Sequence, residues 1–135
     1  MKIFISSTVH ELLDLRREIA SLILEMGFSV VLSEDYDSDF SVECNSNSIE
    51  SCLINLKKSD MAIFILDRRY GGNLKKAGYD NISATHLEYK TAISNKIPFY
   101  FWLFRNHSGN DQACRCLGVM SNPPRKNSAA ILNVS

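Results

Sequence analysis

The chain has 135 residues, of which 45% are hydrophobic and 22% are charged, and its 15 Lys and Arg balance its 15 Asp and Glu. This length supports one domain with one core, and the composition argues against disorder. Zero net charge does not favour nucleic acid or an anionic membrane surface as a partner, and no apolar run approaches the roughly 20 residues that span a bilayer.

The N-terminal third predicts a strand followed by a helix. Lys2–Ile5 is a short apolar run typical of a buried strand. Thr8 and Glu11 have the spacing of a capping box, which predicts a helix over about Val9–Met26, ended by Gly27 as a left-handed cap. The apolar residues expected to face the core recur at helical spacing: Leu12, Leu15, Ile19, Leu22, Ile23 and Met26.

The middle of the chain predicts two strands, with a long loop and a second helix between them. Phe28–Leu32 is the second strand, and the polar loop Ser33–Asn47 after it holds five acidic residues and no basic one. Loops this long inside compact domains are usually functional or mobile. A helix over Ser48–Ser59 and a continuous apolar strand over Met61–Leu66 follow. The helix is expected to pack through Ile49, Cys52, Leu53 and Leu56.

A third helix begins in the stretch Ser83–Tyr89 and carries Glu88, and Ile97–Phe104 is the fourth strand. Leu87, Ala92 and Ile93 are expected to face inward from this helix. The alternation of apolar strands and amphipathic helices ends after Arg105. This predicts a domain over residues 1–105 and an irregular tail over 106–135. The tail is disordered or holds one short strand, Ala129–Val134.

Alternating strands and helices predict an α/β fold with a parallel sheet covered on both faces. Crossover rules favour a flavodoxin-like, doubly wound sheet in the order 2-1-3-4, with the fifth strand weak or absent. The first and third strands are then neighbours, so Ser6-Ser7 and Asp67–Tyr70 end at the same sheet edge. Ligands bind at this edge, and the helix bearing Glu88 begins there.

Several segments, in order, resemble a known family. Ile3–Thr8 is followed by Asp14–Arg17, by Ser33–Tyr36, by Arg69–Gly71 and by Thr85–Tyr89. Together they resemble TIR-like domains, and more closely the domain of unknown function at the N-termini of many bacterial and NLR-type multidomain proteins. The resemblance covers roughly residues 1–104. His86 stands where that family often has an acidic residue, and Lys96 where a helix-ending Gly is usual.

The resemblance implies cleavage of the nicotinamide–ribose bond of NAD in bacterial antiphage immune signalling. It places the catalytic carboxylate on Glu88, nine residues before Ile97. NAD is then the substrate, and no cofactor is expected. The substrate-binding residues are expected to be Ser6, Ser7, Thr8, Glu34, Tyr36, Arg69 and Tyr70.

The residues themselves allow both functional and structural roles. Ser6, Ser7 and Thr8 precede a helix N-terminus, which favours a pyrophosphate, although Thr8 also serves as a cap. Arg69 and Tyr70 suit a phosphate and a base, whereas a surface Arg could instead pair with the acidic loop. Simpler interpretations make Glu88 a solvated helix residue at the dipole, Tyr89 a packing residue, and Arg16 an ordering partner for Glu34.

Alternative functions remain open at this point. TIR-like domains also self-associate, and the loop Ser33–Asn47 corresponds to the segment they use, so a homo-oligomeric scaffold is the main alternative. A nucleoside deoxyribosyltransferase would use Glu88 as its nucleophile. A phosphoacceptor receiver with Asp67 is discarded, because Ser6-Ser7-Thr8 stand where it needs acidic residues.

The cysteines and the N-terminus bear on location and on metals. Cys44, Cys52, Cys114 and Cys116 form no C-x-x-C pair, and the N-terminal apolar run is too short for a signal peptide, so a reduced, cytoplasmic protein is expected. Cys114 and Cys116 near His107 have the wrong spacing for zinc, and no metal is expected.

Overall fold

The structure is a computed structural model, and it describes residues 1–7, 12–33, 39–42, 46–66, 74, 78–79 and 81–103. Within these ranges the chain forms one parallel sheet in the order β2-β1-β3-β4, with three helices. The predicted α/β class and strand order are therefore confirmed. The strands are β1 (Lys2–Ser7), β2 (Ser29–Val31), β3 (Met61–Leu66) and β4 (Phe99–Leu103). The helices are α1 (Leu13–Glu25), α2 (Ser48–Lys57) and α3 (Ala84–Ser94).

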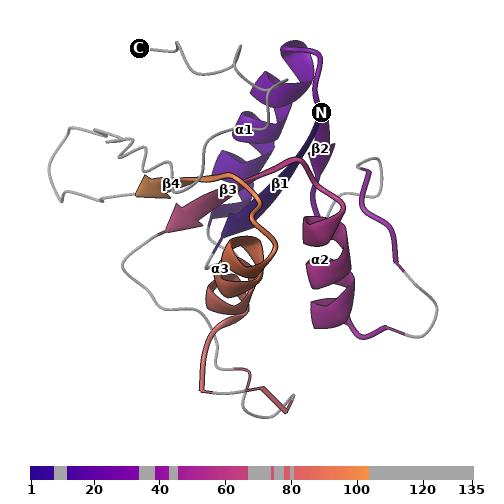
Figure 1. The fold of residues 1–135 in the computed structure, drawn as a ribbon. Helices are drawn as coiled ribbons and strands as arrows, with labels where there is room; N and C mark the ends of the chain where they lie inside the picture. The colour runs from indigo at the N-terminus through magenta and orange to yellow at the C-terminus, as the bar shows by residue number, and fades with distance from the viewer. Residues whose placement is uncertain are drawn as a thin grey trace, which may run out of the picture.

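The helices cover both faces of the sheet, as the doubly wound prediction requires (Figure 1). Because side chains alternate along a strand, Ile3 and Ile5 of β1 pack with α1, whereas Phe4 between them packs with α2 and α3. The core on the α1 side includes Ile19, Ala20, Ile23, Val30 and Ile65. The core on the other side includes Leu56, Phe64, Ala92, Ile97 and Phe99.

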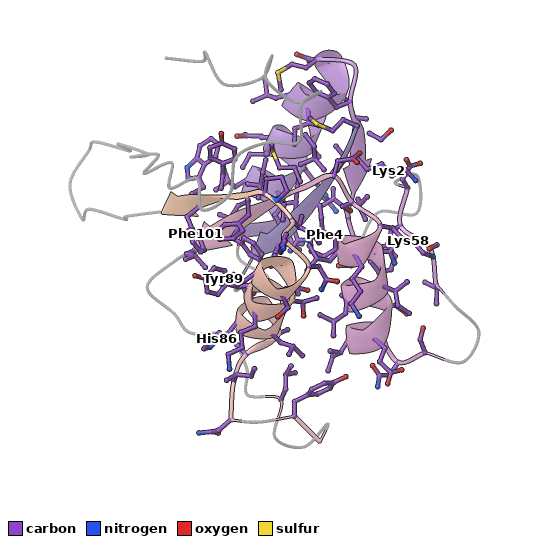
Figure 2. All side chains as sticks on the ribbon, viewed as in Figure 1. Lys2, Phe4, Lys58, His86, Tyr89 and Phe101 are labelled. Atoms are coloured by element: carbon purple, nitrogen blue, oxygen red, sulfur yellow. The ribbon has the colours of Figure 1, made fainter. Side chains whose placement is uncertain are left out.

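Aromatic rings fix α3 against β3 and β4. The ring of Tyr89 meets those of Phe99 and Phe101 with centroids 5.3 Å apart in each pair, and Phe64 packs edge-on to Tyr89 at 6.0 Å. Figure 2 shows Tyr89 and Phe101 on the same side of the sheet. The packing role predicted for Tyr89 is confirmed, and it fixes the rotation of the helix that carries Glu88.

Two helices end in the same backbone motif. After α1, the N–H of Gly27 donates to Leu24 O (2.9 Å) and that of Phe28 to Ile23 O (3.2 Å), with Gly27 at φ +85°, which confirms the predicted cap. After α3, the corresponding bonds are Lys96 N–H to Ile93 O and Ile97 N–H to Ala92 O. Lys96 therefore holds the left-handed conformation (φ 54°) that glycine adopts without steric penalty.

Three residues expected in the core are exposed instead. Leu22, Met26 and Ile93 are 55%, 48% and 46% exposed. Leu22 and Ile93 each lie roughly 100° around their helix from the line of its buried residues. They stand at the edge of an apolar face that is wider in the sequence pattern than the face that the structure buries. Met26 is the C-cap residue, beyond the last helical residue of α1.

The described elements otherwise follow the predicted ones closely. β3 has the predicted bounds, and β1 runs two residues past its predicted end, to Ser7. Thr8 and Glu11 lie outside the described residues, as does residue 104 and everything after it, so the predicted capping box and tail stay predictions. None of the helices in the described ranges has the length and apolar character needed to cross a membrane.

Candidate functional site

The candidate site lies where β1 and β3 end side by side. Their pairing runs to Ser6↔Phe64 and Ser7↔Ile65, whereas the pairing of β1 with β2 stops at Phe4↔Val31. α1 follows β1 on one face of the sheet, and α3 precedes β4 on the other (Figure 1). This edge is therefore the point where the winding of the sheet reverses, which is the usual ligand position in such folds.

Glu88 points from α3 to the end of β1. The Ser6 hydroxyl donates a hydrogen bond to the carboxylate, and both residues are buried, with Glu88 only 8% exposed. Thr85, Glu88 and Ala92 form the buried line of α3. Ser83 is the N-cap residue of this helix, and its hydroxyl accepts from the His86 N–H (3.2 Å). The interpretation of Glu88 as a solvated helix residue is therefore wrong, because tyrosine packing and the cap turn it towards the sheet.

Burial changes the acid–base behaviour of Glu88. Loss of hydration disfavours the charged carboxylate and raises its pKa from 4.5 to about 7, while the Ser6 hydrogen bond and the positive charge of Arg16 act in the opposite direction. Near neutral pH the side chain therefore populates both its acid and its carboxylate forms. A group with this property can exchange a proton or offer a negative charge to a reacting centre.

Arg16 approaches the same strand end from the other face. Its Nη1 donates to Ser7 Oγ (2.8 Å), and its Nη2 donates to the Ile5 carbonyl (3.2 Å). From α3, Thr85 Oγ1 donates to the Ser7 carbonyl (3.0 Å). The last residues of β1 are thus held from both helical layers, and the Ser6–Glu88 contact lies between these bonds.

The structure brings together three of the predicted site residues: Ser6, Ser7 and Glu88. The predicted residues Thr8, Glu34, Tyr36, Arg69 and Tyr70 lie outside the described residues, as do Asp67 and the Cys114–Cys116 pair. In the part of the chain that is described, no three His, Cys, Asp or Glu side chains gather as a metal site would require.

Sequence reasoning missed the contacts of Arg16 and Thr85 with β1. A signal for Arg16 was available, because it falls on the same helical line as Leu12, Ile19 and Ile23. A charged residue at a core-facing position needs buried partners. No comparable signal marks Thr85, since a threonine in the first turn of a helix is ordinary.

One described segment of the acidic loop, residues 39–42, is tied to the domain by hydrogen bonds. The Asn55 amide on α2 donates to Ser41 O (2.6 Å) and Ser51 O (2.7 Å), and its Oδ1 accepts from the Ser41 N–H (2.9 Å). Asp39 lies 3.5 Å from the Lys2 ammonium, while Val42 is 73% exposed. The self-association predicted for this loop stays a prediction.

Three comparisons with known proteins add one match. A family model described as "Domain of unknown function (DUF4062)" matches residues 2–117, which covers every described residue except Met1. A search of the curated proteins and a search of the solved structures each found no match.

Proposed function

The chain belongs to the family described as a domain of unknown function (DUF4062), and we propose that it is a TIR-like domain that cleaves the nicotinamide–ribose bond of NAD. The observation that carries the proposal is a buried carboxylate, Glu88, held by Ser6 at the reversal point of a doubly wound sheet. Its pKa of about 7 is the second support, because perturbed carboxyl groups in such positions are characteristic of functional sites.

The chemistry needs only one carboxylate. When the N-glycosidic bond breaks, its electron pair leaves with nicotinamide, which becomes neutral, and positive charge develops on the ribose C1′ and ring oxygen. The ionised Glu88 stabilises this cation, as a carboxylate does in glycoside hydrolysis. Water then attacks C1′ and releases a proton, so NAD and water give ADP-ribose, nicotinamide and one proton.

The position of Glu88 supports this mechanism. Ser6 holds one carboxylate oxygen, Oε2, which leaves the other oxygen as the atom that faces the ribose in the proposal. Because the pKa is about 7, the reactive ionised form increases through neutral pH. The rate of NAD cleavage is therefore expected to rise with pH and to level off above pH 8.

The decisive assay incubates the purified full chain at high protein concentration with NAD at pH 8 and measures released nicotinamide by chromatography. Glu88→Gln keeps the size of the side chain and removes its charge, and it is expected to lower the rate by roughly 100-fold or more, as loss of a group that stabilises transition-state charge does. Glu18→Gln, an exposed glutamate on α1, is the matched control and is expected to retain the rate.

Two outcomes would reject the proposal. One is nicotinamide release that Glu88→Gln leaves unchanged, which would place the chemistry elsewhere. The other is an absence of release from the folded wild-type chain over pH 6–9, at protein concentrations that allow self-association.

A further inference from the structure

The end of β1 extends past its neighbour β2 and is held there by side chains. Pairing with β2 stops at Phe4, but β1 continues to Ser7. The carbonyls of Ile5 and Ser7 point to the same side of the strand because they are two residues apart. The Arg16 guanidinium donates to the Ile5 carbonyl, and the Thr85 hydroxyl donates to the Ser7 carbonyl.

Among the described residues, Arg16 carries the positive charge that lowers the pKa of Glu88. β3 carries no charged residue, and the only one on β1 is Lys2, at the opposite end of the strand. On α3 itself, Lys90 is exposed and His86 is half-buried one turn before Lys90. The charged residues of α2, Glu50 and Lys57, are exposed. Arg16 is itself buried, at 9% exposed, so its charge is screened only weakly by solvent.

Building on the proposed function, we propose that Arg16 is a positioning residue, which fixes the end of β1 so that Ser6 holds the Glu88 carboxylate in place. It acts through the strand, by its bonds to Ser7 Oγ and the Ile5 carbonyl, and not by contact with NAD. Its charge also favours the ionised carboxylate that the cleavage step uses.

Three variants separate geometry from charge. Arg16→Gln removes the charge and the two-pronged donor, Arg16→Lys keeps only the charge, and Arg17→Gln changes the exposed neighbour on α1 as the control. Both Arg16 variants are expected to lower kcat for NAD cleavage by on the order of 10-fold to 100-fold with KM unchanged, because the carboxylate is misplaced while substrate contacts remain. The control is expected to match wild type.

The titration of Glu88 gives a second readout that needs no activity. In carbon NMR of chains labelled at the Glu carboxyl, the signal absent from Glu88→Gln identifies Glu88. Arg16→Gln is expected to move its titration midpoint upward by about one pH unit, and Arg16→Lys, which keeps the charge but weakens the Ser6 contact, is expected to move it upward by less. A residue that only supports the fold would change neither the midpoint nor kcat of the folded fraction.

The two readouts keep this inference separate from the proposed function. A raised KM with unchanged kcat would make Arg16 a substrate-binding residue and overturn the positioning role, as would an unmoved midpoint in Arg16→Gln. If wild type cleaves no NAD, the proposed function fails, and the NMR midpoints still decide whether Arg16 controls the carboxylate. If Arg16→Gln does not fold, a Lys variant with wild-type kcat overturns the role of the two-pronged contact.

Discussion

The burial of Glu88 predicts an unusual dependence of stability on pH. A pKa of about 7 in the folded chain against 4.5 in the unfolded chain means that the folded state holds its proton more tightly. Below pH 4.5 both states are protonated, and the stabilising effect of the neutral buried acid is fully present. As pH rises from 4.5 through 7, unfolding releases a proton, so the free energy of unfolding falls.

The size of this loss follows from the same two pKa values. At about 1.4 kcal/mol per pH unit, the difference corresponds to about 3 kcal/mol, as an order of magnitude. Glu88→Gln is neutral at every pH and keeps an oxygen that can accept from Ser6. The variant is therefore expected to match wild type near pH 4.5 and to be more stable by about 3 kcal/mol at pH 8.

The assay is urea unfolding of both proteins at fixed ionic strength between pH 4.5 and 8.5, followed by fluorescence. Trp102 is the only tryptophan in the sequence and packs partly buried against the α1 side of the sheet, so its emission reports loss of the core. Groups that titrate equally in both proteins cancel in the difference. A difference that stays constant with pH, or that grows towards acid pH, would refute the assignment of a raised pKa to Glu88.

Two further predictions concern parts of the fold outside the site. Lys96→Gly is expected to stabilise the chain by about 1 kcal/mol, because glycine adopts the left-handed conformation of this residue without steric penalty. Lys90→Gly, inside α3, is expected to destabilise the chain by about 1 kcal/mol. Urea unfolding in which both variants change the free energy of unfolding in the same direction would contradict this. Asn55→Ala is expected to lower the free energy of unfolding by about 2–3 kcal/mol and to speed amide exchange at residues 39–42. Asn55→Asp is expected to be at least as destabilising, because its carboxylate would face the carbonyls of Ser41 and Ser51. Losses below about 0.5 kcal/mol in urea unfolding would show that the hydrogen bonds of the Asn55 amide are not needed for stability.

The fold could be predicted from sequence because its signals are local. Met61–Leu66 is an uninterrupted apolar run, and Gly27 ends an apolar helical pattern, so strand and cap follow from short windows. The order of the strands then follows from general crossover rules. The exposed Leu22 and Ile93 were not predictable, because the sequence shows how wide an apolar face is but not how the helix is rotated against its sheet.

The site was predicted in part for the same reason. Glu88 could be placed at the correct sheet edge because its helix begins there. Its burial and its hydrogen bond to Ser6 depend on how α3 is rotated about its axis. The contact of the Tyr89 ring on α3 with the Phe99 ring on β4 fixes this rotation. The contacts of Arg16 join α1 to β1, and the arginine stands among the apolar residues whose spacing indicated the helix.

The alternation of side chains along β1 explains how two helical layers serve one site. Ser6 points to the α3 face and takes Glu88, whereas Ser7 presents its hydroxyl to Arg16 on the α1 face. A slip of β1 by one residue would exchange these faces and leave both a carboxylate and a guanidinium buried without their partners. The pairing Ser6↔Phe64 must therefore be kept for the site as well as for the core, and the apolar residues Phe4 and Ile5 on the two faces of β1 enforce it.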